Sequence, residues 1–209
     1  MTEPNGVVYL VDDDPRVREA LSELFASQRI EHVTFASGSE YLGFEKPETC
    51  ACLVLDVQLP DINGLDLQER LAEGSGPPII FISGHGDIPL TVRAIKAGAV
   101  EFLTKPVDPE KLLPAIQAAF AEDLERRRKT AGLAILQGRY ALLTPREREV
   151  LPLVAAGMLN KQAAAALGIT EVTLQVHRGQ IMRKMEAGSF ADLVRMAEKL
   201  GIPETDRAL

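Results

Sequence analysis

The chain has 209 residues, of which 46% are hydrophobic and 25% charged, and its formal net charge at pH 7 is −7. This composition is typical of a folded globular protein, and the length suits two domains of the common size of roughly 100 to 150 residues. No apolar run approaches the roughly 20 residues that a membrane helix needs, and the first residues lack the basic and apolar regions of a signal peptide. We therefore expect a cytoplasmic protein with no membrane partner.

Cysteine and histidine give no sign of a disulfide or a metal site. Cys50 and Cys52 are separated by one residue in an expected strand, where alternation sends their side chains to opposite faces. The three histidines, His32, His85 and His177, show no ligand spacing. We expect neither a bridge nor a site with sulfur or imidazole ligands.

Charge is divided unevenly along the chain. Residues 1–120 carry a net charge of −10, and residues 121–209 carry a net charge of +3. The acidic part can hold a cation, and the basic part can meet an anion. A net charge of +3 is small, so it does not by itself indicate that this part binds an anion.

Apolar strands alternate with helical patterns through residue 124. Val7–Val11 is a short apolar strand, three acids follow it, and Pro15 suits the first turn of a helix. The expected later strands are 31–35, 52–56, 78–82 and 100–103, and the expected later helices are 39–44, 65–71, 88–96 and 109–124. Five strands alternating with five helices predict an α/β fold with a doubly wound, five-stranded parallel sheet.

Such a sheet gathers the residues that follow its strands at one edge. Those residues are Asp12, Asp13, Asp56, Ser83 and Lys105. One acid would suffice to cap a helix, whereas three carboxylates in a dry pocket need a divalent cation, and oxygen ligands suit Mg²⁺. Asp56 is the candidate phosphoryl acceptor. Lys105 would neutralise phosphoryl oxygens, and Ser83 would donate a hydrogen bond to one of them.

Four motifs surround these residues. They are Val-Asp-Asp-Asp at 11–14, Leu-Asp-Val-Gln-Leu-Pro-Asp-Ile-Asn-Gly at 55–64, Ser-Gly-His-Gly-Asp at 83–87 and Phe-Leu-Thr-Lys-Pro at 102–106. As a set they resemble the receiver domain of two-component response regulators, particularly the FixJ-like subclass, with a flavodoxin-like fold. The resemblance implies Mg²⁺ on Asp13 and Asp56, a water-linked role for Asp12, and the backbone carbonyl of Gln58 as a further ligand.

The resemblance also implies a conformational switch. Ser83 would move toward the phosphoryl group, and Phe102 would turn inward behind it. Without the resemblance, the alternative for Phe102 is an edge-strand aromatic that simply packs. The peptide bond between Lys105 and Pro106 is expected to be cis. In relatives the face from helix 88–96 onto strand 100–103 forms a phosphorylation-dependent homodimer, to which Val92, Ile95 and Val100 contribute unless they are core residues.

Residues 125–140 are expected to form a linker that is only partly helical, because Gly132 and Gly138 interrupt the helical pattern. The basic run at 126–129 is typical of a solvated helix end beside the C-terminal dipole, with contact to DNA phosphates as the second interpretation. The predicted limits are 1–124 for a receiver domain, 125–140 for the linker and 141–209 for a second domain.

The second domain shows the signals of a small all-α unit of four helices. Thr144 and Glu147 fit a capping box, although Pro152 then lies inside the helix, where it should cost about 3 kcal/mol or force a kink. Asn160 is expected to cap the second helix and Thr170 the third. The later helices are expected at 161–167, 171–185 and 190–200. Short helices joined by a glycine turn fit a helix-turn-helix.

The third of these helices has one apolar core face and one face suited to DNA. At about 100° per residue, Leu174, Ile181 and Met185 share the core face. An exposed glycine in a helix costs about 1 kcal/mol and exposed valines such as Val172 gain nothing in water, but a DNA groove explains both. A small partner-binding bundle is the alternative. The candidate DNA contacts are Lys161, Thr173, Gln175, Val176, Gly179, Gln180, Arg183 and Lys184.

Three motifs carry a second resemblance. Leu-Thr-Pro-Arg-Glu at 143–147, Gly-Met-Leu-Asn-Lys at 157–161 and Val-Thr-Leu-Gln-Val-His-Arg at 172–178 resemble a LuxR-type DNA-binding domain. Gln175 stands where many relatives carry Lys, and Pro152 departs from the usual pattern. Together the resemblances imply a transcription regulator and not an enzyme. A sensor histidine kinase would phosphorylate Asp56, and a homodimer would then bind double-stranded operator DNA, with RNA polymerase as a candidate further partner.

Two other functions fit parts of the sequence. The acids at 12–14, Ser83 and Lys105 also resemble parts of an aspartyl-phosphate phosphatase of the haloacid-dehalogenase type. That family ends its nucleophile motif in Gly-Thr, where this chain has Pro15-Arg16. The remaining alternative is a receiver that acts only through protein contacts.

Overall fold

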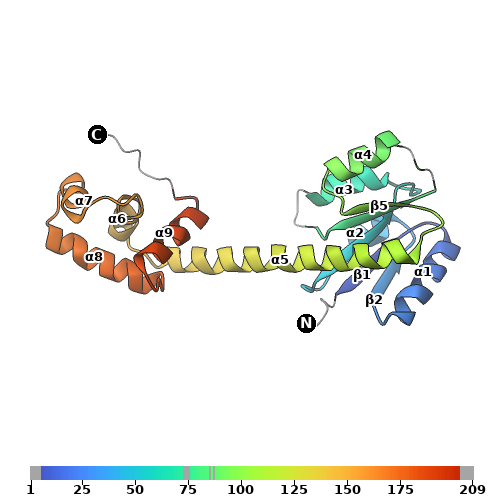
Figure 1. Ribbon diagram of the computed structural model, residues 1–209, viewed down its shortest axis with the longest axis horizontal. Coiled ribbons are helices and arrows are strands. Elements are labelled where there is room, and N and C mark those ends of the chain that lie inside the picture. Colours follow the sequence, from blue (N-terminus) through green and yellow to red (C-terminus); the bar gives the residue numbers. More distant parts are fainter. Residues whose placement is uncertain (1–5, 73–75, 85, 87, 203–209) are drawn as a thin grey trace. The chain divides into compact units, whose positions relative to one another are not determined.

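The computed structural model describes residues 6–72, 76–84, 86 and 88–202, so His85 and Asp87 of the third motif lie outside the described residues. The chain divides into two compact units, Met1–Arg127 and Arg128–Leu209. The first is an α/β unit and the second is helical (Figure 1). Among the described residues, no helix combines the length and apolar character that a membrane crossing requires.

The first unit is built on a five-stranded parallel sheet with the order β2-β1-β3-β4-β5. The strands are β1 (Val7–Val11), β2 (Glu31–Phe35), β3 (Ala51–Asp56), β4 (Ile79–Ser83) and β5 (Glu101–Thr104). β1, β3 and β4 are buried along their whole length, which is why their sequences are continuous apolar runs. The predicted sheet is confirmed, with limits that shift by about one residue.

Helices cover both faces of this sheet. They are α1 (Pro15–Ser27), α2 (Gly38–Gly43), α3 (Gly64–Ala72), α4 (Ile88–Lys96) and α5 (Pro109–Ala141). Because side chains alternate along a strand, Tyr9 and Leu53 pack with α2, α3 and α4, whereas Leu10 and Val54 pack with α1 and α5. The strand order reverses beside β3, and parallel sheets hold their ligands at such a reversal.

α5 does not end near residue 124, so the prediction of a helix broken by glycines is wrong. The helix continues to Ala141, and Gly132 and Gly138 lie inside it with open space where a methyl group would be. Each glycine costs about 1 kcal/mol relative to alanine, which the surrounding helix formers offset.

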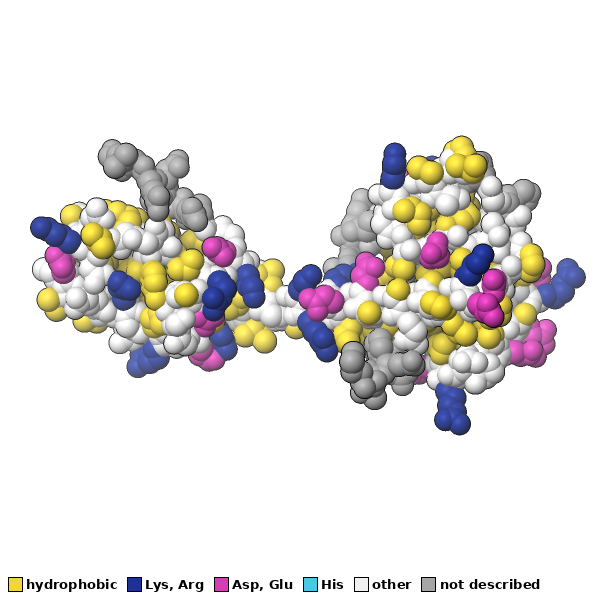
Figure 2. Space-filling view, in the orientation of Figure 1, with side chains coloured by type: hydrophobic (Ala, Val, Ile, Leu, Met, Phe, Trp, Pro, Cys, Tyr) yellow, Lys and Arg dark blue, Asp and Glu magenta, His cyan; other side chains and the backbone are white. Residues whose placement is uncertain are grey.

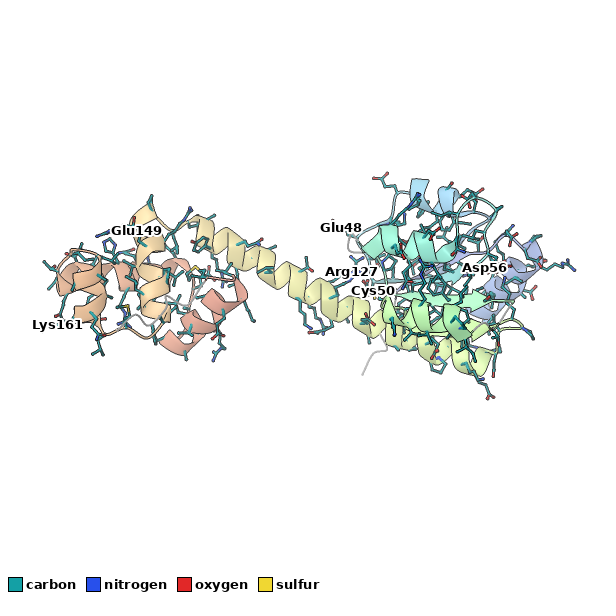
Figure 3. The ribbon with its side chains drawn as sticks, turned by 90° about the horizontal axis from the view of Figure 1, so that it is seen from above. Glu48, Cys50, Asp56, Arg127, Glu149 and Lys161 are labelled. Carbon is teal, nitrogen blue, oxygen red and sulfur yellow. The ribbon has the colours of Figure 1, made fainter. Side chains whose placement is uncertain are left out.

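The buried carboxylate of Asp123 explains part of this continuity. It accepts the backbone N–H of Ala51 at 3.0 Å and pairs with Arg127 at 2.7 Å and with Arg126. Two arginines of the basic run therefore serve an ion-pair network inside a helix, and the predicted helix end at this run is wrong. Figure 3 shows Arg127 and Cys50 at the end of the sheet opposite Asp56.

The second unit is the predicted bundle of short helices. They are α6 (Pro145–Ala155), α7 (Asn160–Ala166), α8 (Glu171–Lys184) and α9 (Phe190–Lys199), which enclose an apolar core. The capping box of Thr144 and Glu147 is present, and α6 runs through Pro152 to its end. The prediction that Asn160 caps α7 is wrong. Leu159 is the N-cap and donates its N–H to the side chain of Gln162 at 3.2 Å.

Replacing Gly132 or Gly138 with alanine should raise the free energy of unfolding by about 0.5–1 kcal/mol each, because both lie in a formed helix. Urea unfolding measures the gain, and the helical circular dichroism of the folded protein should not change. Gly157→Ala is the matched control and should destabilise, because Gly157 has a φ of 77°. A rise in helicity without a gain in stability would indicate the broken linker instead.

Candidate functional site

Three carboxylates meet at the carboxyl ends of β1 and β3. One oxygen from each of Asp12, Asp13 and Asp56 lies within 4.8 Å of the other two. Asp12 is fully buried and Asp56 is 4% exposed, whereas Asp13 faces solvent. The parallel sheet thus brings together acids that are more than forty positions apart in the chain.

Lys105 supplies the positive charge of this pocket. Its Nζ lies 2.6 Å from Oδ2 of Asp12 and 2.6 Å from Oδ2 of Asp56. Its backbone N–H donates to the carbonyl of Ser83 at 2.7 Å, and the expected cis bond to Pro106 is present. Burial lowers the pKa of Lys105, but the hydrogen bonds to the two carboxylates outweigh burial and raise that pKa overall. The ammonium therefore stays charged.

The pocket keeps an excess of negative charge. Three carboxylates face one ammonium, which leaves a formal charge of −2. Burial raises the pKa of Asp12, although Lys105 and the N–H of Asp14, at 2.9 Å, oppose that rise. A divalent cation would neutralise the excess, and hard oxygen donors suit Mg²⁺. The donor set therefore fits Mg²⁺.

The predicted groove-reading face of α8 is open to solvent. Val172 is 71% exposed and Val176 57% exposed, and Gly179 has open space around it. Thr173, Gln175 and Arg183 are exposed on the same helix, Gln180 is half-buried, and Lys161 is exposed on α7 (Figure 3). The opposite face of α8 carries Leu174 and Ile181, and the C-cap Met185 follows on the same side. All three are fully buried, so the predicted core face is confirmed.

Family comparisons identify both units. The response regulator receiver domain matches residues 8–117, and the luxR family of bacterial regulatory proteins matches residues 141–197. The chain belongs to the two-component response regulators with a LuxR-type DNA-binding domain. It is a transcription regulator and not an enzyme, which removes the phosphatase alternative. The receiver implies a histidine kinase as partner, the LuxR-type domain implies DNA, and the acidic triad is typical of a Mg²⁺ site.

Individual relatives resemble this response regulator over nearly its whole length. Nodulation protein W of Bradyrhizobium diazoefficiens is 49% identical over 94% of this chain and 87% of its own. A low-resolution structure of the response regulator StyR is 46% identical, with a TM-score of 0.79 over 92% of this chain and 98% of its own. Full-length FixJ from B. japonicum is 34% identical, with a TM-score of 0.53 over 95% and 98%. The FixJ-like resemblance is confirmed.

Two more predicted receiver residues border the acidic pocket. Gln58 donates its N–H to Oδ1 of Asp56 at 3.1 Å, which places the start of the β3–α3 loop beside the acceptor strand. Ser83 is 2% exposed at the end of β4, one position past the residue that pairs with Asp56. Both therefore lie at the edge of the sheet where β3 ends in Asp56.

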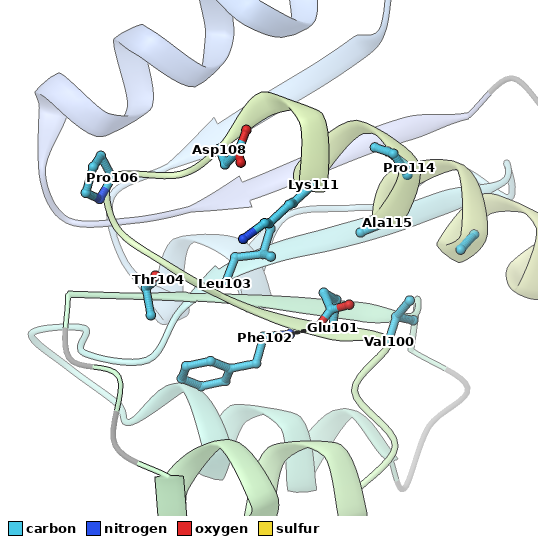
Figure 4. A pocket seen from close by; sticks show the side chains of 11 residues that line it. Val100, Glu101, Phe102, Leu103, Thr104, Pro106, Asp108, Lys111, Pro114 and Ala115 are labelled. Atoms are coloured by element: carbon cyan, nitrogen blue, oxygen red, sulfur yellow. Dashed lines mark hydrogen bonds between the residues drawn. The ribbon is translucent and has the colours of Figure 1, made fainter.

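Phe102 lies on β5 and lines a groove along that strand. It pairs across the strands with Phe81, and the two ring centroids are 6.2 Å apart. A groove of about 620 Å³ runs along β5 beside the start of α5, and in Figure 4 the ring of Phe102 points away from Asp108 and Pro114 on the α5 side. The ring is half-buried against the core cluster beneath α4.

The sequence did not reveal two contacts near the predicted sites. Arg18 donates from Nη1 to the backbone carbonyl of Asp12 at 2.6 Å, and a contact to a backbone atom leaves no sequence signal. Lys184, a predicted phosphate contact, lies 2.7 Å from the buried carboxylate of Glu147. The sequence identified Glu147 only as a capping residue, because no pattern along the chain relates it to Lys184, 37 positions later.

Asp12→Asn should leave the Mg²⁺-free protein at least as stable as the wild type, because it removes one buried like charge and keeps an acceptor for the N–H of Asp14. It should remove most of the stabilisation by Mg²⁺, which is about 2.7 kcal/mol at 100 times Kd. Thermal unfolding with and without Mg²⁺ measures both effects. Asp14→Asn, outside the triad, should keep the Mg²⁺ response. An equal response in the Asp12 variant would contradict the site.

Lys184→Ala should lower the free energy of unfolding of the helical unit by about 1–2 kcal/mol, because it leaves the Glu147 carboxylate buried without its cation. Arg183→Ala, on the exposed face, is the control and should stay within about 0.5 kcal/mol of wild type. Urea unfolding measures both.

The Lys184 effect should depend on pH in one direction. Burial acts to raise the pKa of Glu147, but its hydrogen bonds with Lys184 and Thr144 lower that pKa overall. The stabilisation is therefore present above the ordinary Glu pKa and is lost as pH falls through the lowered value. A destabilisation that persists well below that range would show that Lys184 acts only by packing.

Proposed function

We propose that Asp56 is the phosphoryl acceptor and that a sensor histidine kinase controls DNA binding by phosphorylating it. The observation that carries this proposal is the pairing of a nearly buried Asp56 with Lys105 at 2.6 Å, inside a cluster of three carboxylates. That arrangement combines a nucleophile with the charges that stabilise a transferred phosphoryl group.

The transfer uses the groups around Asp56. An Asp56 carboxylate oxygen forms the bond to phosphorus as the phosphorus–nitrogen bond of the kinase phosphohistidine breaks, and the imidazole leaves with the electron pair. Lys105 then neutralises phosphoryl oxygens, and the Ser83 hydroxyl donates a hydrogen bond to one of them. In the proposed switch, Phe102 turns inward behind Ser83 and vacates its place beside Phe81.

Mg²⁺ would be held by Asp12, Asp13, Asp56 and the backbone carbonyl of Gln58. When bound, it supplies charge neutralisation between the carboxylates and the phosphoryl oxygens. Asp12, with its raised pKa and its pairing to Lys105, suits a ligand that acts through a bound water.

In the helical domain, α8 enters the major groove. Val176 contacts thymine methyl groups, Thr173, Gln175 and Gln180 reach base edges, and Gly179 lets the backbone approach. Arg183 and Lys161 contact phosphates. Lys184 contacts a phosphate while its ammonium also pairs with Glu147. The DNA-binding domain extends over 141–209 and the receiver over 1–124, with residues 125–140 as the linker.

A homodimer of the phosphorylated form binds the operator, since one recognition helix covers too few base pairs to select a site. Hydrophobic side chains gather over α4 in Figure 2, where Ile88 is 76% exposed, Val92 45% and Ile95 43%. Val100 packs in the core and contributes less. RNA polymerase is the further partner, and a function on DNA places the protein in the cytoplasm.

Asp56→Asn should abolish phosphorylation while leaving the fold intact. Intact-mass spectrometry after incubation with acetyl phosphate and Mg²⁺ should show one phosphoryl group on the wild type and none on the variant. Asp66→Asn, an exposed carboxylate on α3, is the control and should still be labelled. A phosphoryl adduct on the Asp56 variant would exclude Asp56 as the acceptor.

A further inference from the structure

The loop between β3 and α3 is closed at its base. The N–H of Gly64 donates to the carbonyl of Val57 at 2.9 Å, and Gln58 and Asn63 form an isolated antiparallel bridge. A methyl group at Gly64 would lie 2.5 Å from the backbone carbonyl oxygen of Asp56, so the loop returns tightly against the acceptor strand. These contacts join the two ends of the loop.

The tip of this loop is held by another element. Asp61 accepts the N–H of Gly38 at 3.2 Å through Oδ1 and the N–H of Ser39 at 2.7 Å through Oδ2. Next to it, Ile62 fills the space where a Cβ of Gly38 would lie. One carboxylate and one apolar side chain thus fasten the loop tip to the first turn of α2.

Asp61 caps the start of α2 from outside that helix, because it accepts the first two helical N–H groups. α2 already has Ser37 as its N-cap, which accepts the N–H of Glu40 at 3.2 Å, and Glu40 in turn accepts the N–H of Ala36 at 2.8 Å. The local cap thus covers the N–H of Glu40 but not those of Gly38 and Ser39, which the loop supplies with an acceptor through Asp61. Hydrogen bonds lower the pKa of Asp61, and the largest contribution comes from Ser39. Asp61 is therefore a carboxylate at neutral pH.

We propose that Asp61 is a positioning residue for the cation. By fastening the loop tip to α2, it restrains the loop that carries the Gln58 carbonyl. The N–H of Gln58 in this loop donates to Oδ1 of Asp56 at 3.1 Å, so the residue itself lies beside the acceptor. A flexible loop would present that carbonyl in many orientations, and the cation would have to order it on binding. This inference rests on the proposed role of the Gln58 carbonyl as a ligand.

The test is a Mg²⁺ titration of the full chain by isothermal calorimetry. Asp61→Ala should raise the Kd for Mg²⁺ about tenfold, the lower end of the effect of losing a group that orients a ligand. Asp61→Asn should raise it less, because the amide oxygen still accepts one N–H. Glu45→Ala removes an exposed carboxylate just after α2 and should leave the Kd unchanged.

Phosphorylation by acetyl phosphate supplies the second readout. The Asp61→Ala variant should need more Mg²⁺ to reach half of its maximal rate, and that rate at saturating Mg²⁺ should equal the wild-type rate. Equal effects of alanine and asparagine would assign the loss to charge alone and overturn the inference. So would an unchanged Kd with a lower unfolding midpoint. Failure of the wild type to bind Mg²⁺ would instead overturn the proposed function.

Discussion

Electrostatic repulsion among three carboxylates is the constraint on which the receiver depends. Asp12 and Asp13 follow β1 and Asp56 ends the neighbouring β3, and one oxygen from each lies within 4.8 Å of the other two. Lys105 reaches two of them at 2.6 Å and leaves the pocket negative. The fold thus maintains a pocket with a net negative charge, which a bound cation would reduce. A phosphoryl group on Asp56 would change the charge of the pocket again.

α5 is the element that the two units share. β3 ends at Asp56, and its first residue, Ala51, is hydrogen-bonded to Asp123 of α5. α5 contributes Phe120 to the receiver core and Tyr140 to the core of the helical unit. One continuous helix therefore takes part in the packing of both units.

Much of the fold could be predicted because it depends on local patterns. Continuous apolar runs identified the buried strands, and the rule that parallel strands end at one edge gathered Asp12, Asp56 and Lys105 before any contact was known. The core face of α8 followed from its helical period. The approach of Lys105 to two acids at once also follows from this topology.

The missed features all depend on contacts between distant residues or on small energy differences. No spacing rule links Asp61 to the N–H groups of α2, or Lys184 to Glu147. The glycines of α5 predict breaks, but a penalty of about 1 kcal/mol each does not end a helix that the ion pairs of Asp123 with Arg126 and Arg127 reinforce. The packing of Phe102 against Phe81 is likewise a contact between neighbouring strands, which the sequence did not specify.

The most direct test of coupling between the pocket and α8 is selection of bound sequences from random double-stranded DNA, with and without acetyl phosphate and Mg²⁺. We expect the phosphorylated protein to enrich an inverted repeat and the Asp56→Asn variant to enrich none under either condition. Enrichment of the same sequence to the same extent without phosphorylation would contradict this expectation, because the acidic pocket would then have no influence on the groove-reading helix.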